Sequence, residues 1–172
     1  YVQDQKDNTV GKSFESYVFG EKLWALPIDA ATPVAAARLD ILKVLGLNLP
    51  QTFDDLLALA KKGLVAFAGI PIDSLMSFYM FCCSLGEAPF QSQNRVISQE
   101  IGVKALKYFR ELAQYIAPEN FDRNPIKVYE AMVNTNNIAY CPFAYGYSNY
   151  SRIGYSKNLL HFYDLVSLNG QN

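Results

Sequence analysis

The sequence predicts an α/β fold, and three observations support this prediction. Signals for strands and helices alternate along the 172 residues, as is typical of this class. Hydrophobic residues make up 51% of the chain and charged residues 18%, so the composition is that of a globular protein with a sizeable core. Residues 64–70, LVAFAGI, form a continuous apolar run suited to a strand that is covered on both faces. The length makes a second full domain unexpected.

The first elements of the chain differ in how clearly they are encoded. Residues 22–28, KLWALPI, read as a strand that Pro27 stops. Residues 31–46 carry the local signature of one helix, because the segment is rich in alanine, Thr32 can cap it and Gly46 can end it. Only local signals support this helix, and tertiary context can override local propensity.

The clearest helix lies immediately before the apolar run. Thr52 can cap it, two aspartates follow at its positive end, two lysines lie at its negative end and Gly63 terminates it. Further helices are predicted with Asp73 as a cap, from Ser98 onward, and from Asn124, which precedes a proline in the first helical position.

The charge and the motifs exclude several classes of function. A net charge of −1 and a pI near 5.8 do not indicate the excess of positive charge that binding to nucleic acid or an anionic membrane requires. The chain has no apolar stretch long enough to span a bilayer and no phosphate-binding glycine loop, so neither a membrane span nor a cofactor is expected. Cys82, Cys83 and Cys141 lack metal-site spacing, and His161 has no catalytic partner nearby. We therefore expect neither a metal nor catalytic residues.

One aromatic run favours a binding function. A predicted strand over residues 137–143 leads into IAYCPFAYGYSNYSRIGY, residues 138–155, which holds six aromatic rings separated mostly by small or hydroxylated residues. Flat rings can cover the apolar face of a sugar, while short polar side chains such as Asn149 and Asp29 can bond its hydroxyls. Packing in the core is the alternative for each ring taken singly. A last strand is predicted within residues 159–166.

Two segments resemble family 1 extracellular solute-binding proteins, the receptors of carbohydrate ABC transporters. The first contains a glycine-to-proline crossover at 20–27, an Asp-Ile-Leu turn at 40–42 and a Pro-Gln-Thr-Phe helix start at 50–56. The second, residues 125–152, is similar to the family's helix, strand and aromatic turn. Cys-Pro-Phe at 141–143 stands where the family has a Gly-Pro-Trp-like corner, which leaves the identity of the sugar open.

The resemblance implies one lobe of a type II periplasmic-binding-protein fold, a two-lobed architecture with three α/β/α layers. Residues 1–26 would be the end of the first lobe and the crossover, and residues 27–172 an incomplete second lobe, so the chain would be a piece of a longer protein. The resemblance also overrules the helix starting at Pro33. It implies an extended segment over 31–38 and a helix only over 40–45.

The resemblance further implies binding by hinge closure around a sugar, an oligosaccharide or a polyol. The partner would be the membrane permease of an ABC importer, and the location periplasmic or extracellular, either free or as an anchored lipoprotein. Phe143 would stack on the ligand with Tyr145 and Tyr147 beside it, and Asp29 would accept hydrogen bonds from its hydroxyls. The full set of expected substrate-binding residues is Asp29, Asp73, Phe143, Tyr145, Tyr147 and Asn149.

Two alternatives from other classes remain open. A carbohydrate-active enzyme would need two of the carboxylates of Asp29, Asp73 and Glu87 to converge, and turnover of a sugar would reveal it. A tyrosine-rich protein-interaction module would retain a protein partner in excess saccharide.

Overall fold

The computed structural model describes residues 1–29, 31 and 33–168. The chain divides into two compact units, Tyr1–Thr32 and Pro33–Asn172, so the division falls a few residues beyond the predicted crossover at residue 27. The assignment of the two sides to different lobes remains a prediction. Among the described residues, no helix combines the length and the hydrophobicity that a membrane span requires.

The first unit contains a short antiparallel hairpin in which β1 pairs with β2. Gly20 and Glu21 connect the two strands with φ values of 56° and 61°, as a two-residue hairpin turn with two left-handed positions requires. The strand predicted over 22–28 is limited to two residues because β1 offers no more partners. The elements of this unit are α1 (Val2–Asp7), η1 (Glu15–Tyr17), β1 (Val18–Phe19) and β2 (Lys22–Leu23).

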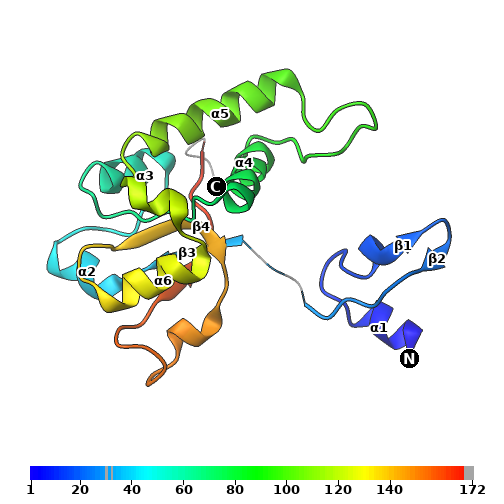
Figure 1. The fold of residues 1–172 in the computed structure, drawn as a ribbon, viewed down its shortest axis with the longest axis horizontal. Coiled ribbons are helices and arrows are strands. Elements are labelled where there is room, and N and C mark those ends of the chain that lie inside the picture. The colour runs from blue at the N-terminus through cyan, green and yellow to red at the C-terminus, as the bar shows by residue number, and fades with distance from the viewer. Residues whose placement is uncertain (30, 32, 169–172) are drawn as a thin grey trace. The chain divides into compact units, whose positions relative to one another are not determined.

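The second unit is built around a sheet in which, within the described ranges, β3 lies between β4 and β5 and is antiparallel to both. Helices cover the sheet on both faces, with α3, α4 and α5 above the strands and α6 below them in Figure 1. The predicted α/β class is therefore confirmed. The strands are β3 (Pro33–Ala37), β4 (Tyr140–Tyr145) and β5 (His161–Tyr163), and the helical elements are α2 (Leu39–Val44), α3 (Phe53–Ala60), α4 (Pro71–Ser84), α5 (Gln99–Ala113), η2 (Pro118–Asp122), α6 (Pro125–Asn134) and η3 (Ser148–Ser151).

The alanine-rich segment forms the central strand, so the local helix signature over 31–46 is wrong and the extended structure implied by the resemblance is confirmed. The expected cap Thr32 lies outside the described residues. Ala35, Ala36 and Ala37 are fully buried between the helical layers. Small side chains are what a strand covered on both faces can accommodate here, and this packing outweighs the helix propensity of alanine.

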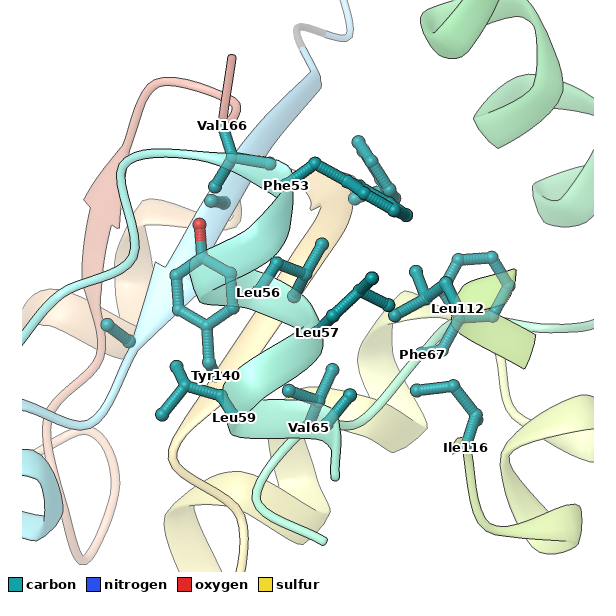
Figure 2. Packing of buried hydrophobic residues seen from close by; sticks show 14 of the residues in the cluster. Phe53, Leu56, Leu57, Leu59, Val65, Phe67, Leu112, Ile116, Tyr140 and Val166 are labelled. Atoms are coloured by element: carbon teal, nitrogen blue, oxygen red, sulfur yellow. The ribbon is translucent and has the colours of Figure 1, made fainter. Parts of the chain in front are cut away.

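Two hydrophobic clusters lie on opposite faces of this sheet. Alternate residues of β3 enter different clusters, as the two-residue period of a strand requires. Ala35 and Ala37 join the side chains of α3, α4 and α5, whereas Ala36 joins those of α6. Figure 2 shows the larger cluster, in which α3 packs between Tyr140 of β4 and Leu112 of α5. The core thus fixes the orientation of β4, which leads into the aromatic run.

A β-bulge interrupts the alternation in β4. Val34 pairs with Ala144 and Ala36 with Cys141, so one residue of β3 stands opposite two residues of β4. One of those two is Pro142, which has no N–H to contribute to the ladder. Past the bulge the faces are exchanged relative to strict alternation: Phe143 falls on the side of α4 and Ala144 on the side of α6.

The predicted helix starts are mostly confirmed. Thr52 accepts a hydrogen bond from the N–H of Asp55, Ser98 caps α5 and Asn124 caps α6. Asp73 is not a cap, because α4 begins two residues earlier at Pro71 and places Asp73 in its first turn.

The two remaining predicted strands are shorter than expected. Residues 64–70 run extended beside β4, where the Ala66 N–H donates to the carbonyl of Tyr140 at 2.9 Å, but only Val65 forms a ladder bridge. The run is nevertheless buried from Val65 to Ala68, as its apolar sequence indicates. The last strand is limited to β5.

Candidate functional site

The aromatic run divides between the core and the surface. Tyr140 and Tyr150 are 1% and 4% exposed, whereas Tyr147 and Tyr155 are 41% and 54% exposed. Tyr145, the last residue of β4, is half-buried. Ring spacing in the sequence therefore predicts an aromatic cluster but does not separate the rings that build the fold from those that could meet a ligand.

Phe143 belongs to the core. It is 3% exposed, and its ring packs edge-to-face against Phe81 of α4 with ring centroids 4.7 Å apart. The bulge in β4 places the ring on the face that α4 covers, because it reverses the alternation of the strand at this point. In this unit the Phe143 ring offers no face for the expected stacking on a ligand.

Tyr145 and Tyr147 lie at the end of β4, where the chain leaves the sheet. The carbonyl oxygen of Tyr145 accepts the hydroxyl of Tyr129 at 2.9 Å and the N–H of Tyr147 at 2.8 Å. The ring of Tyr147 meets Tyr129 edge-to-face, with centroids 6.1 Å apart. The backbone that carries the exposed Tyr147 ring is thus held by these hydrogen bonds, and the ring itself by its contact with Tyr129.

Asp73 lies close enough to this turn for its charge to act on Tyr145. Burial, and after it the charge of Asp73, raises the pKa of the Tyr145 hydroxyl. Burial also raises the pKa of the half-buried Asp73 itself. Among the residues that the structure describes, the Asp73 carboxylate has no hydrogen-bond or ion-pair partner. An acceptor that protein groups leave unused is available for the hydroxyls of a ligand.

Asn149 lines a shallow hollow of about 320 Å³ beside the turn. Its side-chain oxygen accepts a hydrogen bond from Nη1 of Arg152 at 3.2 Å, so its amide is oriented although the residue is exposed. The hollow is lined by Ile126, Gly146, Tyr147, Ser148, Asn149, Tyr150 and Tyr155.

Asp29 belongs to the first unit. It is exposed and lines a hollow of about 440 Å³ that also involves Pro27 and Ile28. In the second unit the charge of Asp73 acts on Tyr145, and Tyr147 and Asn149, a few residues further along, line the same hollow.

Glu87 has a structural role. Its carboxylate accepts hydrogen bonds from both the N–H and the hydroxyl of Ser98 at the start of α5, the former at 2.8 Å. The hydrogen bond from the Ser98 side chain lowers the pKa of Glu87. A general acid needs the opposite shift, so this arrangement does not favour Glu87 as the general acid of a catalytic carboxylate pair.

Tyr129 is the residue that sequence reasoning missed. It is fully buried on α6, and its hydroxyl donates to the carbonyl of Tyr145 from the face of the sheet that α6 covers. One signal was present: a tyrosine on the apolar face of a helix needs a hydrogen-bond partner for its hydroxyl, and the sequence gives no partner within the helix.

Comparison with known proteins identifies the fold of the chain. No protein-family model matches the sequence, and no curated protein matches it. Solved structures do match. The maltose-bound MalE3 of T. maritima superposes with a TM-score of 0.77 at 18% identity, covering 97% of this chain and 46% of that chain.

Two further matches are solute-binding proteins of ABC transporters. The protein from Agrobacterium radiobacter K84, in complex with ribitol, gives a TM-score of 0.74 at 18% identity over 97% of this chain and 45% of that chain. The protein from Agrobacterium vitis S4, with bound D-mannitol, gives a TM-score of 0.68 at 16% identity and covers 98% of this chain and 46% of that chain.

These matches define the class of fold. The matched proteins are type II periplasmic binding proteins, and the chain spans about half of their length. The chain therefore has the fold of one lobe of a type II periplasmic binding protein, as the sequence resemblance implied. The resemblance to carbohydrate solute-binding proteins is confirmed at the level of the fold.

Proposed function

We propose that the full-length protein is the substrate-binding component of an ABC importer and that its ligand is a sugar, an oligosaccharide or a polyol. The observation that carries this proposal is the fold, because solved structures that match nearly the whole chain hold maltose, ribitol or D-mannitol. Those proteins bind rather than transform their ligands, and we propose a binding role without catalysis here as well.

The proposed site is the surface at the end of β4. Tyr145 and Tyr147 would cover the apolar face of a ligand, the unused carboxylate of Asp73 would accept hydrogen bonds from its hydroxyls, and Asn149 would form part of the rim. Asp29, in the first unit, stays a predicted substrate-binding residue. Phe143 would support this surface from the core through its contact with Phe81.

The proposed mechanism is hinge closure. A ligand held between two lobes shifts the population toward the closed form by as much as its affinities for the two forms differ. The membrane permease would read the closed form, and the location would be periplasmic or extracellular.

A screen of neutral saccharides and polyols against the full-length protein tests the function. We expect at least one to raise the melting temperature, since a ligand that binds only the native state stabilises it. Failure of every member of a broad panel, or turnover of a sugar, would contradict the proposal.

Substitution of Tyr147 tests the site. With a ligand from the screen, Tyr147→Ala should weaken binding about tenfold or more in calorimetry, because a flat contact surface is lost. Tyr115→Ala is the matched control, since Tyr115 is an equally exposed tyrosine of the same unit, at 37%, but lies beside Lys61. Equal affinities for Tyr147→Ala and Tyr115→Ala would remove Tyr147 from the site.

A further inference from the structure

The carbonyl oxygen of Tyr145 is a junction that fixes the backbone where β4 ends. It accepts two hydrogen bonds, one from the N–H of Tyr147 and one from the hydroxyl of Tyr129. A carbonyl oxygen has two lone pairs, so these two donors fill its capacity. Pro33 stands opposite Tyr145 in the sheet and has no N–H to donate. Tyr129 therefore supplies a bond that the strand ladder cannot.

The backbone that follows has few anchors of its own. The hydrogen bond from Tyr147 to Tyr145 closes a three-residue turn, and the N–H of Ser148 closes a second one onto the carbonyl of Gly146 at 2.8 Å. Tyr147 has φ −73° and ψ 75°, the values of an inverse γ-turn. On its other side the carbonyl of Tyr147 accepts the N–H of Tyr150 at 3.1 Å. On the side of β4, the Tyr147 backbone is attached to the sheet through the Tyr145 carbonyl, so the groups that hold this carbonyl help to set the direction of the Tyr147 side chain.

Tyr129 also meets the exposed ring directly. Its ring contacts Tyr147 at an interplanar angle of 79°, and on other edges it contacts Tyr150 and Phe162 with centroids 5.5 Å and 5.8 Å away. These contacts hold the Tyr129 ring within the core. Burial raises the pKa of its hydroxyl, which keeps it a protonated donor at all ordinary pH values.

We propose that Tyr129 is a positioning residue of the ligand site: from the core it orients Tyr145 and Tyr147 without touching the ligand. This inference rests on the proposed saccharide-binding function. It names a buried residue of α6 as a determinant of affinity. The Tyr129 hydroxyl donates to the carbonyl of Tyr145, whereas the neighbouring Glu130 of α6 accepts the hydroxyl of Tyr150 at 2.6 Å, further along the segment.

The variant Tyr129→Phe in the full-length protein tests the proposal, because it removes the hydroxyl and keeps the ring. We expect the dissociation constant for a saccharide from the screen to rise about tenfold, the effect of one lost hydrogen bond on a site. We also expect amide hydrogen exchange at Tyr147 to accelerate in the absence of ligand, since its acceptor carbonyl is no longer held.

Ser151→Ala is the matched control. Ser151, an exposed residue of the same unit, donates its hydroxyl to the carbonyl of the buried Leu160 at 2.7 Å. Its loss should lower the melting temperature about as much as Tyr129→Phe does while leaving the affinity within about twofold.

The outcomes separate this inference from the proposed function. An affinity of Tyr129→Phe within about twofold of wild type, or an equal loss in Ser151→Ala, would overturn the positioning role. If the wild-type protein binds no saccharide, the proposed function fails, and hydrogen exchange at Tyr147 alone decides the inference: acceleration supports it and unchanged exchange overturns it.

Discussion

Phe143 and Tyr147 are two aromatic residues of one segment with opposite environments, and their substitution should separate stability from binding. Phe143→Ala should lower the free energy of unfolding by about 3–5 kcal/mol, because it removes a ring that is 3% exposed and leaves a cavity against Phe81. Tyr147→Ala should cost no more than about 1 kcal/mol, since the ring is 41% exposed.

Denaturant unfolding of the two full-length variants measures both values. A free-energy loss for Phe143→Ala as small as that for Tyr147→Ala would mean that the Phe143 ring is not part of the core. The same experiment shows whether any loss of binding in Phe143→Ala follows from the fold rather than from a lost contact with ligand.

At the residue scale the sequence predicts the composition of the candidate site better than its geometry. The aromatic run and Asn149 could be read directly because their residue types suit a hydroxylated ligand. The face on which Phe143 is buried could not, because it depends on a bulge opposite Ala35, and a bulge is a property of the pairing of two strands far apart in the sequence. The role of Tyr129 depends on the same long-range pairing.

At the scale of elements, α3 offers a test of local encoding. The side chain of Thr52 accepts from the N–H of Asp55, and the Asp55 carboxylate accepts from the N–H and the hydroxyl of Thr52 at 3.0 Å and 2.9 Å. The hydroxyl of Thr52, followed by two backbone N–H groups, lowers the pKa of Asp55. Thr52→Ala should therefore destabilise the protein by about 1 kcal/mol at neutral pH.

This loss should depend on pH in a defined direction. A carboxyl whose pKa is lower in the folded state stabilises the protein above its unfolded-state pKa, and this contribution disappears as the pH falls through the folded-state value. The difference in unfolding free energy between wild type and Thr52→Ala should thus shrink on acidification below the ordinary pKa of an aspartate. Denaturant titrations at neutral and acidic pH measure it, and a difference that grows in acid would contradict the capping-box account.

Elements with local signals were predicted well, and elements that depend on partners were not. Thr52, Ser98 and Asn124 begin helices because each side chain satisfies N–H groups within three residues. The extended segment over 31–38, within which β3 lies, is implied only by the family resemblance, since alanine favours a helix locally. Residues 64–70 were recognised as buried, but the extent of their pairing depends on β4.

At the scale of the whole molecule, the order of loose motifs carried more information than any single motif. The crossover at 20–27, the turn at 40–42, the helix start at 50–56 and the corner at 141–143 appear in the order of one lobe. The solved structures then match nearly the whole chain at identities below 20%. The fold is thus conveyed by the sequence of elements, whereas the identity of the ligand depends on side-chain placement that this order does not specify.

The charge of the chain leads to a prediction about binding as a whole. The formal net charge is −1, and the proposed ligands are neutral, so no long-range attraction between protein and ligand is available to be screened. Raising the salt concentration from about 0.1 M to 1 M shortens the Debye length from about 10 Å to 3 Å, yet the affinity for a neutral saccharide should change less than about twofold. The proposed hydrogen bonds to Asp73 and contacts with Tyr147 would act at short range and be little affected by this screening. Calorimetric titration at both salt concentrations measures the effect, with the melting temperature of the unliganded protein as a control for changes in stability.

A steep fall in affinity with salt would instead indicate a charged partner, as expected for a protein-interaction surface, and would contradict a neutral ligand at this site.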